Sequence, residues 1–431
     1  MPIDKKITSW LSKTNRIAFV VFVIMAAFMT YSSMYAFRKP FAAATYGDVF
    51  FFGIHIKIWL ITAQVIGYTL SKFIGIKVVP EMPNNKRAVT IVILVLMAEV
   101  SLLLFALINS PVRIVFMFFN GLPLGIIWGV VFSYLEGRRV TELLGAGLSV
   151  SFIFASGAVK SVGKWLILHF EVSDYWMPFL TGAIFLIPLL ASVWLLNCVP
   201  DPDETDIKLR TQRKQMPKQS RVAFFKEFAT VIVLFIITYS FLTIFREMRD
   251  NFAAEIWNSL GFSDDPAIFT LSEIPVGLGS LLCMAIVTFI IDNGKALKVI
   301  QYMIIAGFAI IGIATFLFQV NFINGVWWMI IIGFGLYLAY IPFNALLFER
   351  MIAAFKYVST IGYIMYLADS FGYLSSIIVF LVKNFFNPGL SWLKFFQAAG
   401  YNLSIAGVLL SIITMVILNR KHKKRIESLP Q

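Results

Sequence analysis

The chain has 431 residues, of which 59% are hydrophobic and only 14% are charged. A soluble protein of this size cannot bury so much apolar surface in its core, so lipid must be the solvent for much of the chain. The net charge of +13 does not indicate a nucleic-acid-binding protein, because the basic residues lie between apolar runs and not on one basic face. Composition and charge therefore exclude a soluble enzyme and a nucleic-acid-binding protein.

Twelve apolar segments are long enough to cross ~30 Å of hydrocarbon as helices, whereas membrane-spanning β-strands are shorter and alternate apolar with polar residues. The first segment follows a basic tail, as in a signal peptide, but its run from Ile17 to Phe37 is too long for one. We therefore expect it to be retained as a helix. The predicted spans cover residues 17–45, 54–76, 88–108, 112–135, 141–168, 175–197, 222–250, 267–291, 296–318, 324–347, 354–382 and 395–418.

The polar stretch from Asp201 to Arg221 divides these spans into two sets of six. We predict an all-α integral membrane protein with twelve transmembrane helices in two pseudo-symmetric six-helix bundles, 1–197 and 222–431, joined by a cytoplasmic central loop at 198–221. Most of the 36 lysine and arginine residues lie on one side if both termini, including the basic C-terminal tail, are cytoplasmic. We expect a monomer in a cell membrane, such as a bacterial inner membrane.

The two halves carry similar charged residues at nearly constant separation along the chain. Such a separation is typical of a duplicated six-helix unit. Arg38 matches Arg246 and Glu136 matches Glu349, and the loop that begins near Lys72 after the second span matches the loop that begins at Asp292 after the eighth.

The segment from Gly67 to Lys77, at the end of the second predicted span, resembles the signature that follows the second helix in the major facilitator superfamily, although Ser71 replaces its usual aspartate. The second copy, which begins at Asp292, keeps the acid. The resemblance implies a secondary transporter whose two halves rock about a central site. It also implies that packing or gating residues lie at Gly67, Lys72 and Asp292, and we add Glu136 and Arg138 at the end of the fourth span.

Within that superfamily, the chain resembles the organophosphate:phosphate antiporters. Their first helix carries two tyrosines and an arginine, matched here by Tyr31, Tyr35 and Arg38, and their seventh helix carries a second arginine, matched by Arg246. In that family the two arginines bind the substrate's phosphate. The histidine of its fifth helix is missing here, where Lys160 is the notable polar residue, so the substrate does not transfer and the chain can equally belong to a separate bacterial branch.

Residue chemistry also suggests an anion site at these positions. The spacing of Tyr31, Tyr35 and Arg38 places them on one helix face, where a guanidinium can bind an oxyanion. The alternative is an interfacial belt that anchors the helix at the headgroups. For Arg246 the alternative is a local ion pair with Asp250, four residues on. A lysine in hydrocarbon costs roughly 2.5–3.5 kcal/mol, so Lys160 should face a cavity or a partner.

Among the carboxylates inside predicted spans, we single out three that can either relay protons or pair with Lys160 or an arginine such as Arg249. They are Glu99, Glu273 and Asp369. The series Gly121, Gly125 and Gly129 in the fourth span permits close helix packing. In the tenth span, Pro342 followed by Asn344 suggests a bent helix with a polar opening.

We therefore predict a carrier of a small anionic solute, such as an organic phosphate, that works by exchange through alternating access. Arg38 and Arg246 would hold the anion, Tyr31 and Tyr35 would shape the pocket, and Lys160 would add positive potential. One alternative is proton symport of a neutral or zwitterionic solute, and another is a membrane sensor or scaffold without transport. An enzyme is not expected, because the sequence has no nucleophile–base pair, phosphate-binding glycine loop or metal constellation, and we expect no cofactor or metal.

Overall fold

The computed structural model describes residues 3–79, 81–136, 138, 140–202, 218–355, 361–386 and 389–427. Within these residues, eleven helices are long and apolar enough to cross a membrane. The predicted eleventh span, 354–382, overlaps a further helix, α17 (Ile361–Phe386), and lies partly outside the described residues. The prediction of an all-α membrane protein is therefore confirmed. Most of the predicted central loop, 198–221, also lies outside the described residues.

Contacts between Cα atoms divide the chain into two compact units. Unit 1 comprises Met1–Arg210, Arg249–Ile274 and Ile377–Leu390, and unit 2 comprises Thr211–Met248, Pro275–Ser376 and Ser391–Gln431. Unit 1 thus combines the first half of the chain with the ends of helices from the second half. The predicted division into two six-helix bundles stays a prediction.

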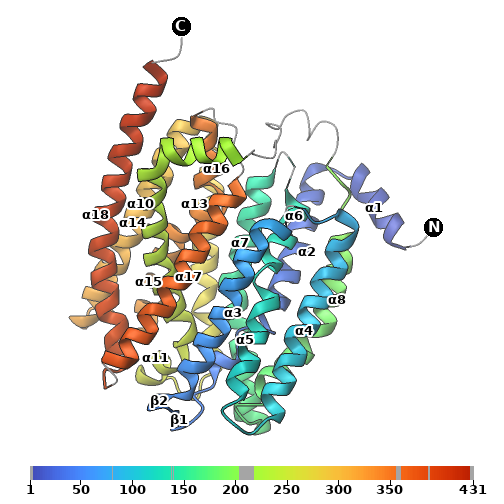
Figure 1. Cartoon of the computed structure of the whole chain (residues 1–431), viewed down its shortest axis with the longest axis vertical. Coiled ribbons are helices and arrows are strands. Elements are labelled where there is room, and N and C mark those ends of the chain that lie inside the picture. The colour runs from blue at the N-terminus through green and yellow to red at the C-terminus, as the bar shows by residue number, and fades with distance from the viewer. Residues whose placement is uncertain are drawn as a thin grey trace. The chain divides into compact units, whose positions relative to one another are not determined.

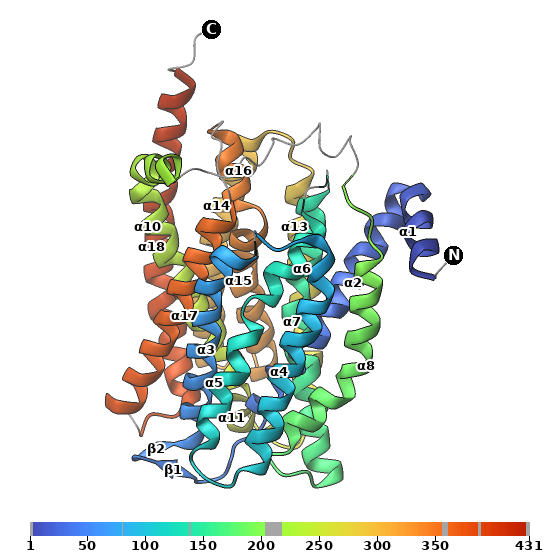
Figure 2. The same cartoon turned by 45° about the vertical axis from the view of Figure 1, so that its right-hand side comes forward.

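Unit 1 contains the first six predicted spans and one small hairpin, β1 (Phe50–Phe51) with β2 (Ile54–His55). Its hairpin and its short N-terminal helix α1 lie at opposite ends of the unit (Figures 1 and 2). The helices that begin in this unit are α1 (Ile3–Lys13), α2 (Arg16–Tyr35), η1 (Pro40–Ala43), α3 (Ile56–Val78), η2 (Asn84–Lys86), α4 (Arg87–Leu107), α5 (Arg113–Leu124), α6 (Ile127–Leu135), α7 (Thr141–Phe170), α8 (Met177–Asn197), α11 (Ala253–Ser259), α12 (Ile268–Leu271) and α13 (Glu273–Thr288).

Unit 2 is built around α14, which packs against α15, α16 and α18. Figure 1 shows α14, α15 and α18 as neighbouring helices of this unit. Two long helices, α10 and α17, place most of their length in unit 2 and their last turns in unit 1. The helices are α10 (Lys218–Asn251), α14 (Asn293–Gln319), α15 (Gly325–Ala345), α16 (Leu347–Ala354), α17 and α18 (Trp392–Glu427).

Three predicted spans are interrupted. The span 17–45 is not one helix, because α2 ends at Tyr35 and η1 starts at Pro40, whose ring nitrogen cannot donate the hydrogen bond that a continuing helix needs. The span 112–135 breaks between α5 and α6, just after Pro123. The span 267–291 divides into α12 and α13. The predicted proline of the tenth span lies inside α15.

Helices α3 and α5 approach each other closely enough that their glycines leave no room for a side chain. A Cβ atom on Gly67 would lie 2.2 Å from the carbonyl oxygen of Phe118, and one on Gly121 would lie 2.1 Å from that of Gln64. A Cβ atom on Gly125 would lie 2.6 Å from the Tyr68 carbonyl oxygen. Gly67, Gly121 and Gly125 therefore lie where α3 and α5 approach each other closely, and the gating role of Gly67 stays a prediction.

Replacing Gly67 by leucine should push α3 away from α5. We expect the free energy of unfolding to fall by about 1–3 kcal/mol, because overpacking displaces backbone that has no space to yield. Thermal unfolding in detergent micelles measures the change. Gly389→Ala is the control, since nothing lies within 4 Å of a Cβ atom at that position. Equal melting temperatures for the two variants would contradict the close contact.

Candidate functional site

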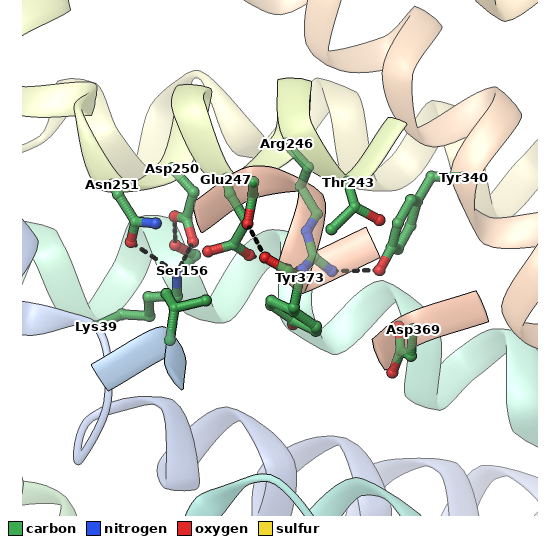
Figure 3. A network of polar contacts seen from close by, with 12 residues as sticks. Lys39, Ser156, Thr243, Arg246, Glu247, Asp250, Asn251, Tyr340, Asp369 and Tyr373 are labelled. Carbon is green, nitrogen blue, oxygen red and sulfur yellow. Dashed lines mark hydrogen bonds and ion pairs between the residues drawn. The ribbon is translucent and has the colours of Figure 1, made fainter. Parts of the chain in front are cut away.

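Arg246 lies at the centre of a buried polar cluster in unit 2. Its Nη1 donates to the Tyr340 hydroxyl of α15, and its Nη2 donates to the Tyr373 hydroxyl of α17 at 2.7 Å. The same Nη2 forms an ion pair with Glu247 Oε1 at 2.6 Å. The guanidinium carbon also lies 4.7 Å from the Tyr340 ring centroid and 5.2 Å from that of Tyr373. Figure 3 shows Arg246 directed at Tyr340.

The cluster continues from Tyr340 to Asp369. The hydroxyls of Tyr340 and Tyr239 lie 2.6 Å apart, and their rings stack with centroids 4.9 Å apart. Tyr239 also donates to a carboxylate oxygen of Asp369 and lies 3.4 Å from Asn344 Oδ1. A hydrogen-bonded path therefore joins Arg246 to Asp369 through two tyrosines. We call Tyr239, Arg246, Glu247, Tyr340, Asn344, Asp369 and Tyr373 the arginine–tyrosine cluster.

The predicted alternative for Arg246, an ion pair with Asp250, is wrong. Arg246 pairs with its neighbour Glu247, while the carboxylate of Asp250 accepts from two lysines. The i+4 spacing places Asp250 one turn further along α10, where Lys160 of α7 and Lys39 of the segment between α2 and η1 lie within reach. These contacts replace the local pair.

Asp250 is the centre of a second cluster, in unit 1. Its carboxylate binds Lys39 Nζ at 2.5 Å and Lys160 Nζ at 2.6 Å, and it accepts a hydrogen bond from Ser156. Lys39 also donates to Asn251 Oδ1 at 3.0 Å. Figure 3 shows Lys39 reaching towards Asp250 and Asn251. We call these five residues the lysine–aspartate cluster. Lys160 was expected to face a partner, and that partner is Asp250. It is none of the three carboxylates singled out in the sequence.

Two further buried ion pairs lie in unit 1. Arg249 Nη1 contacts Glu273 Oε1 at 2.6 Å. Of the two roles considered for Glu273, proton relay and ion pairing, this contact fits ion pairing. Lys57 Nζ contacts Glu255 Oε1 at 2.6 Å and donates to the Ala42 carbonyl oxygen. Removing one partner of such a pair leaves a buried charge, which is strongly destabilising.

Arg38 is buried, with 2% of its surface exposed, and its guanidinium carbon lies 3.6 Å from the Tyr68 ring centroid. This burial does not fit an anchor at the lipid headgroups. Arg38 follows the end of α2, so the prediction that it shares one helix face with Tyr31 and Tyr35 is wrong. The ring centroids of the two tyrosines lie 5.4 Å apart. Arg38 belongs to unit 1 and Arg246 to unit 2. The sharing of one anion by the two arginines stays a prediction.

Glu99 of α4 differs from the other acids. It is 7% exposed, and neither carboxylate oxygen has a hydrogen-bond partner among the described residues. Gly182 of α8 makes room for it, since a Cβ atom there would lie 2.2 Å from Glu99 Oε2. Its role in coupling stays a prediction.

The predicted gating residues make local contacts. Lys72 Nζ lies 5.3 Å from the Tyr68 ring centroid and 5.9 Å from that of Trp128. Asp292 is exposed and caps α14 by accepting from the Lys295 backbone N–H at 2.6 Å. Arg138 donates to the carbonyl oxygens of Tyr134 and Pro200, and Glu136 is the C-terminal cap of α6. Asn344 donates to the Tyr340 carbonyl oxygen at 3.3 Å.

Sequence reasoning missed several members of the two clusters. The tyrosines gave no signal, because tyrosine is also common at membrane interfaces. Glu247 and Lys39 did give a signal, since each is a charge within or beside an apolar span and such charges are functional candidates by default. The missed residues are Lys39, Ser156, Tyr239, Glu247, Asn251, Tyr340 and Tyr373, and Asp250 was considered only as a partner of Arg246.

Replacing Asp250 by asparagine should destabilise unit 1. The two lysines would keep their charges and lose the carboxylate between them, which costs roughly 3–5 kcal/mol for a buried pair. Thermal unfolding in detergent should show a lower melting temperature than for Asp264→Asn, a matched change at an exposed carboxylate. Equal melting temperatures would contradict a stabilising role for the lysine–aspartate cluster.

Comparisons with known proteins agree with this architecture. Residues 40–421 match the model of a family of unknown function, DUF5690. No curated protein sequence matches the chain significantly. The solved structure of the major facilitator superfamily proton:xylose symporter XylE, bound to 6-bromo-6-deoxy-D-glucose, is similar with a TM-score of 0.64 at 15% identity, and the match covers 94% of this chain and 97% of that one.

The nucleoside transporter NupG is similar with a TM-score of 0.58 at 13% identity, over 92% of this chain and 98% of that one. These identities are too low to transfer a substrate, but both alignments extend over nearly whole chains. The resemblance to organophosphate antiporters is tested by none of these matches. The protein is thus a member of the DUF5690 family, and it has the fold of major facilitator superfamily transporters.

Proposed function

We propose that the protein is a secondary active transporter that carries a small anionic solute by alternating access. Its fold is that of proteins described as a proton:xylose symporter and a nucleoside transporter, which supports transport and leaves the solute open. Rocking of helix bundles about a site near the bilayer midplane needs neither ATP nor a metal. The solute class is argued from the buried side chains.

The observation that carries the proposal is the arginine–tyrosine cluster. A guanidinium inside membrane-spanning helices is costly, and such charges are kept where they bind solutes or ions. Arg246 presents planar donors that suit a carboxylate or a phosphate, and the hydroxyls of Tyr340 and Tyr373 beside it can hydrogen-bond the same ligand. We assign Arg246 as the anion contact of unit 2, and Arg38, with Tyr31 and Tyr35, stays the expected contact from the first half.

Exchange is the less favoured mode of transport. Obligatory exchange would follow if Arg38 and Arg246 repelled each other and so kept the empty carrier from changing conformation until an anion neutralised them. Arg246, however, already has the carboxylate of Glu247 at 2.6 Å, and Lys160 already has that of Asp250. An empty carrier with internal counter-ions can change conformation without a bound anion. The ion pair with Glu247 therefore favours net transport of the anion over obligatory exchange.

Counterflow into proteoliposomes, screened against phosphorylated and carboxylated metabolites, tests the proposal. Arg246→Lys should lower the apparent affinity for the transported anion roughly 10- to 100-fold, because a lysine cannot reproduce the planar donors of arginine. Lys298→Gln, which removes an exposed cation of unit 2, should leave transport unchanged. Absence of counterflow with every anion would exclude an anion carrier.

A second candidate function is proton-coupled transport of a neutral solute. It is favoured by the hydrogen bond between Tyr239 and the buried carboxylate of Asp369, because an intramembrane acid with a hydroxyl partner can take up and release a proton.

Under this second candidate, Asp369→Asn should abolish accumulation of the solute against its gradient and spare its downhill counterflow. A protonophore should reduce accumulation by the native protein to the level of the variant. Accumulation that survives both treatments would rule out Asp369 as the coupling acid.

A further inference from the structure

Glu99 lies near the middle of α4, and its carboxyl group has no polar partner among the described residues. It stands twelve positions after Arg87, the first residue of α4, and eight before Leu107, the last. These separations correspond to roughly 18 Å and 12 Å along a helix that rises ~1.5 Å per residue. The residue is 7% exposed, and neither carboxyl oxygen forms a hydrogen bond with a described residue. The carboxyl group is therefore far from both ends of the helix and enclosed by protein.

Helix α8 covers this carboxyl group. Helices α4 and α8 pack side by side (Figures 1 and 2). A Cβ atom on Gly182 of α8 would lie 2.2 Å from Glu99 Oε2 and 3.0 Å from Oε1, so the acid lies directly on the α8 backbone. Between Met177 and Asn197, the sequence of α8 contains no acidic or basic residue. The helix that covers the carboxyl group thus offers no charge to pair with it.

The other elements packed against α4 are α5, α6 and η2. The titratable groups that they and α4 carry are Arg113 at the start of α5, Tyr134 near the end of α6, Lys86 of η2 and Arg87 at the start of α4 itself. Tyr46 and Tyr175 reach α4 further along, at the ring of Phe105. Over the described part of the chain, none of these groups forms an ion pair or a hydrogen bond with Glu99.

The surroundings of Glu99 favour its neutral form. An ionised carboxylate without a counter-ion or a hydrogen bond is strongly unfavourable in a medium that solvates ions poorly, and such a group takes up a proton instead. Glu99 is therefore a neutral acid in this conformation. Its ionised form would need water or a cation beside its oxygens. Both oxygens are buried against α8, so such a partner reaches them only when α4 and α8 separate.

We propose that Glu99 is a proton-binding site of the transporter, occupied while α4 and α8 are in contact and vacated when they separate. The proposal rests on the proposed transport function. A site that binds a proton more tightly in one conformation than in another ties proton binding to the conformational equilibrium, and the linkage is reciprocal. Uptake of the proton on one side of the membrane and its release on the other then couple the proton gradient to movement of the solute.

Asn120 of α5 joins α4 to the loop that carries Arg38. Its Nδ2 donates to the carbonyl oxygen of Ala98, the residue before the buried acid, at 3.1 Å and to that of Phe37 at 2.9 Å. Its Oδ1 accepts from Gln64 Nε2, which also donates to the Arg38 carbonyl oxygen. A displacement of α4 therefore reaches the loop of Arg38, the expected anion contact of the first half. Asn120 is thus a positioning residue between the proton site and the anion site.

Two measurements on the purified full chain test the proton site without any solute. At about pH 7, where exposed carboxylates are ionised, the infrared spectrum of the native protein should contain the C=O stretching band of a neutral carboxylic acid, and that of Glu99→Gln should lack it. Thermal unfolding should show that the native protein loses stability relative to Glu99→Gln as the pH rises from about 5.5 to 8.5. The unfolding equilibrium constant should rise about tenfold per pH unit relative to the variant, because the folded native chain holds one proton that the unfolded chain releases. Glu81→Gln, the same change at an exposed acid, should behave like the native protein.

A third measurement tests coupling in proteoliposomes, with an anion that gives counterflow. An inward proton gradient of one pH unit should accumulate the anion about tenfold for each coupled proton in the native protein and in Glu81→Gln. Glu99→Gln should keep counterflow and lose this accumulation. Asn120→Leu, which removes the hydrogen bonds to Ala98 and Phe37, should keep the infrared band and lose the accumulation as well.

The outcomes separate this inference from the proposed function. Identical infrared spectra and parallel melting temperatures of the native protein and Glu99→Gln at every pH would show that Glu99 is ionised in the folded chain, and would overturn the inference. A neutral acid band together with full accumulation by Glu99→Gln would reduce Glu99 to a structural acid, which overturns the inference and leaves an anion carrier in place. If no anion gave counterflow, the anion-carrier function would fall, while the infrared and thermal measurements would still decide whether Glu99 binds a proton.

Discussion

The pairing of buried charges governs the arrangement of this protein. In a medium that solvates ions poorly, an ionised side chain is stabilised by an opposite charge or an aromatic face. Helix α10 shows the constraint most clearly, because Arg246, Glu247, Arg249 and Asp250 lie within little more than one turn. Each of the four has a partner of opposite charge, so the last turns of this helix must be positioned together with several other helices.

The tyrosines of unit 2 add direction to this pairing. A carboxylate alone would hold Arg246, but the hydroxyls of Tyr340 and Tyr373 also accept hydrogen bonds from its two terminal nitrogens and so fix the plane of the guanidinium. Tyr239 extends the hydrogen bonds to Asp369. The result is a polar cluster whose donors are held in fixed orientations by side chains of α10, α15 and α17.

Sequence patterns predicted the helices well, because runs of about twenty apolar residues have one stable form in lipid. The sequence patterns predicted the interruptions of helices less well. The first span was predicted to continue through Pro40 because apolar residues follow that proline, whereas α2 ends at Tyr35. Partners of charges were predicted least well. Helical spacing favoured an ion pair between Asp250 and Arg246. In the structure Asp250 pairs with Lys160, which is distant in sequence, so no local pattern could indicate the pair.

The backbone contact between α3 and α5 has a consequence for how the surroundings of Arg38 can evolve. Gln64, beside Gly121, donates to the Arg38 carbonyl oxygen, and Tyr68, beside Gly67, supports the Arg38 guanidinium. The loop that carries Arg38 is therefore held in place by a seam of glycines. A larger residue in that seam would shift Tyr68 and with it the cation above its ring, so the position of this buried charge can change through substitutions at residues that do not contact it.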